Sequence, residues 1–219
     1  MLNFYFSWTR YTTLLFLLTV IFIGASFFLP VEYSYENHLL ENLEVVILFV
    51  GFLLSLINLC KEQIYECGLF YIGSAIIYLL MIGRELSWGR VFYPIGIDNH
   101  GEQIFIKVQQ LWYGSIVYPI ITLLIILAIA LLSYFAYSCR TRGIRLNIPV
   151  ECLALFVLMS VLSQCVFDRG LLHITTYYNQ LLEENCEIIA YLSLVLCSYK
   201  IYFKKIYIRI KYFQIKLNF

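Results

Sequence analysis

Apolar residues along this chain gather into six long runs, separated by short polar stretches. The runs extend approximately over residues 11–29, 43–59, 68–83, 115–137, 148–167 and 188–203. A helix of about 20 apolar residues crosses a hydrocarbon core about 30 Å thick. Backbone groups in lipid must bond within their own segment, which favours helices over open strands. The pattern therefore predicts an all-α, polytopic membrane helix bundle with about six transmembrane helices, of which the second and third are short.

Composition supports this class. Hydrophobic residues make up 62% of the chain and charged residues 13%, whereas soluble domains have roughly 45–50% and about 25%. No second hydrophobic core remains outside the runs. We therefore expect one transmembrane domain over residues 1–203 and a basic amphipathic cytoplasmic tail over 204–219. Ile206, Ile210, Phe213 and Leu217 would form one apolar stripe of that tail, lying on the anionic leaflet.

The charges predict an orientation. When the polar stretches are assigned alternately to the two sides of the predicted membrane, starting from the N-terminus, 11 of the 15 lysines and arginines fall on one side. Loops rich in lysine and arginine face the cytoplasm. We expect a multi-pass protein of the cell inner (plasma) membrane with both termini cytoplasmic. The first run has no clear small-residue cleavage pattern after it, which indicates a retained anchor. Membrane lipids are the expected partners, and no nucleic acid is expected because topology already accounts for the basic residues.

The acidic residues fall mainly on the other side, together with the histidines. That side has 11 of the 14 acids and all three histidines. Glu44 and Glu187 lie at the apolar boundaries of the second and sixth runs, Glu85 ends the third, and His173 follows the fifth. A negative helix N-terminus would explain acids that begin a helix. It does not explain Glu85, which lies at a helix C-terminus and would pair either with a neighbouring arginine or with a group on another helix.

Two other features predict structure rather than chemistry. The outer stretch IGIDNHGEQIF predicts either a turn between two short strands or an irregular cap. The seven cysteines are scattered singly, which favours small apolar residues of the bundle over a metal or disulfide role.

The end of the third run carries the sequence Arg84-Glu85-Leu86-Ser87-Trp88-Gly89-Arg90. It resembles a group of bacterial multi-pass membrane proteins of unknown function that carry a Glu-x-Ser-Trp-Gly-Gln/Arg motif. Arg84 stands where that group has a first glutamate. The resemblance implies a membrane domain with a polar site at its outer face and implies no established activity. The chain also has a fainter likeness to metal-dependent ceramidase-type hydrolases, but it lacks the His-x-x-x-His helix pair of those enzymes.

Three functions remain open from the sequence. The first is an enzyme that acts on a lipid or lipid-linked substrate in the outer leaflet by hydrolysis or group transfer, with Glu85, His173, Glu44 and Glu187 as catalytic groups or ligands. Glutamate and histidine can bind a divalent metal ion, act as general bases or hold a cationic headgroup. The second is a non-catalytic membrane subunit that docks to protein partners in a larger complex. The third, least favoured, is a transporter or channel. The sequence specifies neither the substrate nor the metal.

Overall fold

The computed structural model describes residues 2–98, 103–171 and 176–205 of the chain. The predicted tail, residues 204–219, therefore lies outside the described residues except for its first two residues. The helices are α1 (Arg10–Ala25), α2 (Leu39–Lys61), α3 (Tyr65–Glu85), α4 (Gly114–Arg142), α5 (Val150–Val161) and α6 (Thr176–Lys200). The strands are β1 (Leu2–Tyr5), β2 (Pro94–Ile97), β3 (Gln103–Phe105), β4 (Ile144–Pro149) and β5 (Tyr202–Lys205). Shorter helical segments are η1 (Val31–Ser34), η2 (Ser87–Phe92), η3 (Val108–Gln110) and the π-helix η4 (Leu162–Phe167).

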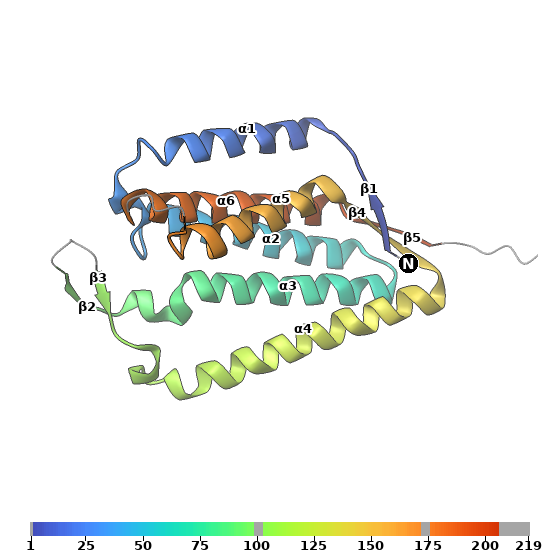
Figure 1. Cartoon of the computed structure of the whole chain (residues 1–219). Coiled ribbons are helices and arrows are strands. Elements are labelled where there is room, and N and C mark those ends of the chain that lie inside the picture. Colours follow the sequence, from blue (N-terminus) through green and yellow to red (C-terminus); the bar gives the residue numbers. More distant parts are fainter. Residues whose placement is uncertain (1, 99–102, 172–175, 206–219) are drawn as a thin grey trace, which may run out of the picture.

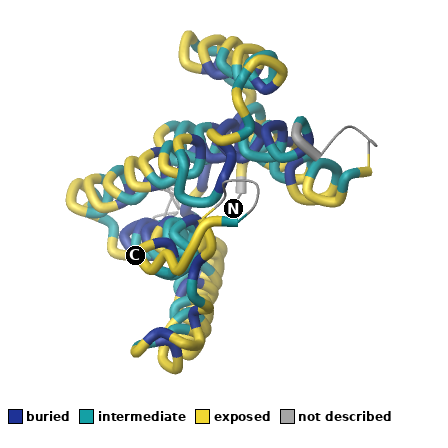
Figure 2. The backbone as a smooth tube through the Cα atoms, turned by 90° about the vertical axis from the view of Figure 1, so that its left-hand side faces the viewer, coloured by how far each residue is buried: buried dark blue, intermediate teal, exposed yellow. Residues whose placement is uncertain are grey.

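The fold is predominantly helical, as predicted, and its helices lie side by side (Figure 1). α6 packs against α1, α2 and α5, while α3 packs between α2 and α4. The buried core gathers around α6, with Leu48 of α2, Tyr78 of α3 and Ile188 of α6 among its most enclosed side chains. In Figure 2, α1 at the top and α4 at the bottom carry many exposed residues and few buried ones. Because these residues are largely apolar, both helices present surfaces suited to lipid.

Within the described residues, four helical segments are long and apolar enough to cross a membrane. They are Val31–Lys61, Tyr65–Glu85, Gly114–Arg142 and Val150–Phe167. α1 is apolar but has 16 residues, and the first half of α6 is acidic. The four spans indicate a membrane protein, and the prediction of six remains a prediction.

The two ends of the bundle have different structures (Figure 1). At one end, here called the sheet end, β4 pairs in parallel with β1 and antiparallel with β5. The sequence did not predict this sheet, because its strands are too short to stand out beside the helical runs. At the other end, called the hairpin end, β2 and β3 pair antiparallel. That pairing confirms the first of the two structures predicted for this outer stretch.

A buried ion pair holds the sheet end together. Lys200 Nζ lies 2.6 Å from Glu151 Oε1, and both side chains are almost fully buried. The same ammonium donates to the carbonyl oxygen of Ser7 at 3.0 Å. The segment that follows β1 is thus tied to the ends of α5 and α6.

α6 begins earlier than the sequence predicted, at Thr176 instead of near Glu183, where the acids before the sixth apolar run were expected to open the helix. Hydropathy locates the lipid boundary, whereas a helix can continue beyond it into polar surroundings. Glu187 therefore lies well inside α6, where the charge at the helix N-terminus has largely decayed. Another interaction must account for its burial.

Candidate carboxylate site

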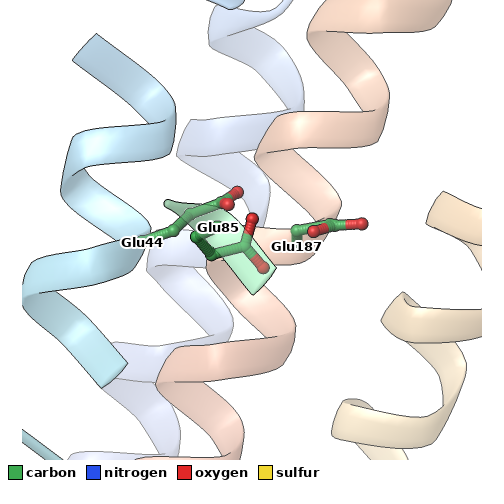
Figure 3. A group of neighbouring side chains, drawn as sticks. All are labelled: Glu44, Glu85 and Glu187. Atoms are coloured by element: carbon green, nitrogen blue, oxygen red, sulfur yellow. The ribbon is translucent and has the colours of Figure 1, made fainter. Parts of the chain in front are cut away.

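Three glutamates from three helices meet near the hairpin end of the bundle. Glu44 lies in the second turn of α2, Glu85 is the last residue of α3, and Glu187 lies within α6. One carboxylate oxygen from each lies within 4.8 Å of the others, and all three residues are buried. Figure 3 shows the carboxylates of Glu44 and Glu85 next to each other, with that of Glu187 beyond them. We call these residues the three-glutamate site.

Glu85 is held by donors from two helices. Arg84 Nε donates to Glu85 Oε1 at 2.9 Å, and the hydroxyl of Tyr191 on α6 donates to the same oxygen at 2.6 Å. The partial negative charge at the end of α3 disfavours a carboxylate there. The two donors offset this effect. The sequence left two pairings open for Glu85, one with a neighbouring arginine and one with a group on another helix, and the structure shows both.

Glu187 has the largest set of hydrogen-bond donors. Ser163 Oγ donates to Oε1 at 2.9 Å, and Gln164 Nε2 donates to the same oxygen. The Tyr191 hydroxyl lies 3.1 Å from Oε2, so its single proton is shared between this oxygen and Oε1 of Glu85, and Arg84 Nη2 also donates to Oε2. Ser163 and Gln164 are consecutive residues of the π-helix η4. Such π-helical turns occur frequently at functional sites, and here one presents two adjacent polar side chains to the same carboxylate oxygen.

Glu44 has a different environment. The residue is fully buried, with 0% of its surface exposed. Neither of its carboxylate oxygens has a hydrogen-bond partner among the described residues. A buried carboxylate without partners costs several kcal/mol. Adding a proton removes the charge but creates an O–H group that itself needs an acceptor. Glu44 therefore requires a charged or hydrogen-bonding partner at its carboxylate that no described residue supplies.

A divalent cation satisfies that requirement. The three carboxylates carry three negative charges when ionised and Arg84 carries one positive charge, which leaves a net charge of minus two. Calcium binds oxygen ligands at about 2.3–2.6 Å and magnesium at about 2.0–2.1 Å. Oxygens on opposite sides of one calcium ion thus lie up to about 5 Å apart, and around magnesium about 4 Å. The three oxygens, which all lie within 4.8 Å of one another, are therefore close enough to share one divalent ion.

The turn after α3 fixes the position of Glu85. Ser87, Trp88 and Gly89 all have positive φ angles, of 44°, 56° and 88°. Such a run is costly for the two residues with side chains. Ser87 Oγ donates to Glu36 Oε1 at 2.8 Å, and Arg90 forms an ion pair with the same oxygen. The Glu-x-Ser-Trp-Gly-Arg sequence thus has a structural role, because it turns the chain sharply and anchors it to the segment before α2.

The structure brings together three of the four site residues predicted from sequence: Glu44, Glu85 and Glu187. The fourth, His173, lies outside the described residues. Sequence reasoning missed Tyr191, although it lies four residues after Glu187 and so on the same face of α6. It also missed Ser163 and Gln164, whose signal was a polar pair within an otherwise apolar run.

We compared the chain with models of known protein families, with curated proteins and with solved structures, and none of them matches. The fold and the site therefore define its class. It is a helical membrane protein with a buried cluster of three carboxylates at one end of its bundle.

Proposed function

We propose that this chain is a multi-pass protein of the cell inner membrane that binds a divalent cation at the three-glutamate site. We further propose that the bound cation serves hydrolysis or group transfer on a lipid or lipid-linked substrate. The observation that carries the proposal is Glu44, whose fully buried carboxylate lacks any hydrogen-bond partner among the described residues and lies beside two other glutamates. A bound cation would provide the missing partner.

The proposed topology has six transmembrane helices and both termini in the cytoplasm. Lys61 ends α2, Arg142 ends α4 and Lys200 ends α6, all toward the sheet end. The excess of basic residues there supports a cytoplasmic position. Glu44 and Lys61 are 17 residues apart on α2, which corresponds to about 25 Å along a helix. The three-glutamate site would then lie in the outer part of the membrane.

The chemistry follows from the ligands. A divalent cation polarises a carbonyl or phosphoryl oxygen and makes a bound water easier to deprotonate. Glu44, Glu85 and Glu187 would hold the ion, and Tyr191 would orient two of them. His173, which lies outside the described residues, remains our candidate for a general acid or base. The motif around Glu85 supports, as a further proposal, kinship with the bacterial membrane proteins that carry Glu-x-Ser-Trp-Gly-Gln/Arg.

The second candidate function is a non-catalytic subunit of a larger membrane complex. It is favoured by α4, of which only 6% of the most apolar stretch is buried in the described structure. Such a face suits either lipid or a partner helix. A transporter is less well supported, because the three-glutamate site lies near one end of the bundle rather than at the bilayer midplane.

The test uses purified full-length chain in vesicles made from a bacterial total lipid extract, with calcium, magnesium or manganese. Wild-type chain should form new lipid products with one of these ions and none with chelator. Glu85→Gln should form none while keeping its thermal midpoint, and the control Glu32→Gln, at an exposed glutamate of the same end, should match wild type. Full activity in Glu85→Gln would refute the catalytic proposal. A lack of products together with a stoichiometric partner in native membranes would favour the subunit.

A further inference from the structure

A small cavity adjoins the three-glutamate site. It has a volume of about 160 Å³, and its walls come from α3, α5, η4 and α6. Glu187 of the three-glutamate site also lines this cavity, together with Tyr191, which bonds Glu187, so the cavity and the site are contiguous. Met81, Phe156 and Ala190 supply apolar surface. With each water occupying about 30 Å³, the space holds about five groups of that size, which is the number of non-hydrogen atoms in a phosphate.

Arg84 supplies the cavity with positive charge. Its Nε bonds Glu85, and its Nη2 bonds Glu187 and Tyr191. Within the described part of the chain, no hydrogen bond uses its Nη1, and 51% of the side chain is exposed. An arginine has five donors in a planar fork that matches the oxygens of a phosphate. The exposed edge of Arg84 is therefore available for an anionic ligand.

The negative charge of the three glutamates requires that the cation bind before the phosphate. Without a cation, Glu187 and its two neighbours would repel a phosphate from this cavity. A divalent cation at the three-glutamate site would offset the net charge of minus two on the three glutamates and Arg84, and it would present positive charge to the same space. A phosphate would then be attracted by both the cation and Arg84.

We propose that the cavity between α3 and α5 binds the phosphate group of a phospholipid, and does so only when a divalent cation occupies the three-glutamate site. This inference rests on the proposed function and assigns it a substrate class. Arg84 and Gln164 are the exposed residues of the cavity, so its mouth lies toward the hairpin end, between two apolar helices. The phosphate group of a phospholipid would enter the cavity while its acyl chains extend along those apolar helices. A soluble phosphate compound has no acyl chain to lie there.

The experiment measures lipid retention by native mass spectrometry of the full chain in dodecyl maltoside. The probes are phosphatidylglycerol, diacylglycerol without phosphate, and soluble glycerol phosphate, each with calcium or with chelator. Arg84→Gln removes the proposed anion contact, and Ser160→Leu fills the cavity from the α5 wall as a second, independent variant. Arg169→Gln is the matched control, an exposed arginine of the same end that does not line the cavity. Calcium binding is measured in every variant.

Wild-type chain should retain phosphatidylglycerol with calcium and lose it with chelator, and diacylglycerol should not be retained. Arg84→Gln and Ser160→Leu should lower retention about tenfold or more, while Arg84→Gln still binds calcium because it leaves the glutamates in place. Equal retention in Arg84→Gln, or retention independent of calcium, would overturn the inference. Glycerol phosphate bound as tightly as the lipid would support phosphate recognition but assign the ligand to the aqueous phase. If wild-type chain did not bind calcium, that result would instead refute the proposed function itself.

Discussion

The hydroxyl of Tyr191 lies 2.6 Å from Oε1 of Glu85 and 3.1 Å from Oε2 of Glu187. One side chain of α6 thereby orients two of the three carboxylates and connects α6 to the end of α3. Groups that orient metal ligands in this way contribute to affinity without touching the ion. The role of Tyr191 can therefore be separated from that of the glutamates.

Tyr191→Phe should lower the affinity for calcium about tenfold to a hundredfold, the usual effect of losing a group that orients ligands. The side chain keeps its apolar volume, so the fold should persist. Calorimetric titration of calcium into the detergent-solubilised chain measures the effect. Tyr78→Phe is the control, since this buried tyrosine bonds Ser198 at 2.7 Å, away from the three-glutamate site. Equal affinities in wild type and Tyr191→Phe would rule out the orienting role.

Glu44→Gln should stabilise the chain when no cation is present. The substitution removes a buried charge that lacks partners, which we expect to add about 1–3 kcal/mol to the free energy of unfolding. In calcium the order should reverse, because only wild type gains stability from binding. Thermal midpoints with chelator and with excess calcium give both results. A lower midpoint than wild type in chelator would contradict the account of Glu44.

The buried pair Lys200–Glu151 at the sheet end should be structural. Lys200→Met leaves Glu151 buried without its partner and should cost about 3–5 kcal/mol. The double substitution Lys200→Met with Glu151→Leu should recover most of that loss, because no unpaired charge remains. Denaturation of the wild type and of the two variants measures the differences. Calcium affinity should be unchanged in the double variant, since 13 residues along α6, or about 20 Å, separate Lys200 from Glu187; a large change would link the two ends.

Gly89→Ala should destabilise the turn that positions Glu85. Gly89 has a φ of 88°, and an added Cβ would lie 2.5 Å from the hydroxyl oxygen of Tyr113. We expect a loss of about 1–3 kcal/mol in the free energy of unfolding, together with weaker calcium binding. Gly96→Ala is the control, because an added Cβ there meets nothing within 4 Å. Were both variants to behave like wild type, the turn would have no part in forming the site.

Much of the arrangement could be predicted from the sequence. Long apolar runs follow directly from the physical chemistry of lipid, so the helices were predicted close to their observed positions, except for the start of α6. The glutamates at the ends of those runs were predicted to converge because alternate crossing of a membrane brings such ends to one face. The structure places Glu44, Glu85 and Glu187 within 4.8 Å of one another, as that reasoning expected.

What could not be predicted depends on contacts between distant residues. The pairing of β1 with β4 joins residues more than 140 positions apart, and no local pattern specifies it. The hydroxyl of Tyr191 and the π-helical turn at Ser163 and Gln164 were missed for a related reason. Tyrosine and serine are common in membrane helices, and only the packing of α5 against α6 shows that these side chains reach Glu187.

The central claim is that Glu44, Glu85 and Glu187 hold one divalent cation, and a calcium titration of wild type and Glu44→Gln tests it most directly. Calorimetry on the full chain in detergent should give one calcium ion per wild-type chain and no measurable binding in Glu44→Gln. Glu32→Gln, which removes an exposed glutamate at the same end, should bind calcium as wild type does. Binding of one ion with unchanged affinity in Glu44→Gln, or no binding of calcium, magnesium or manganese by wild type, would contradict the account.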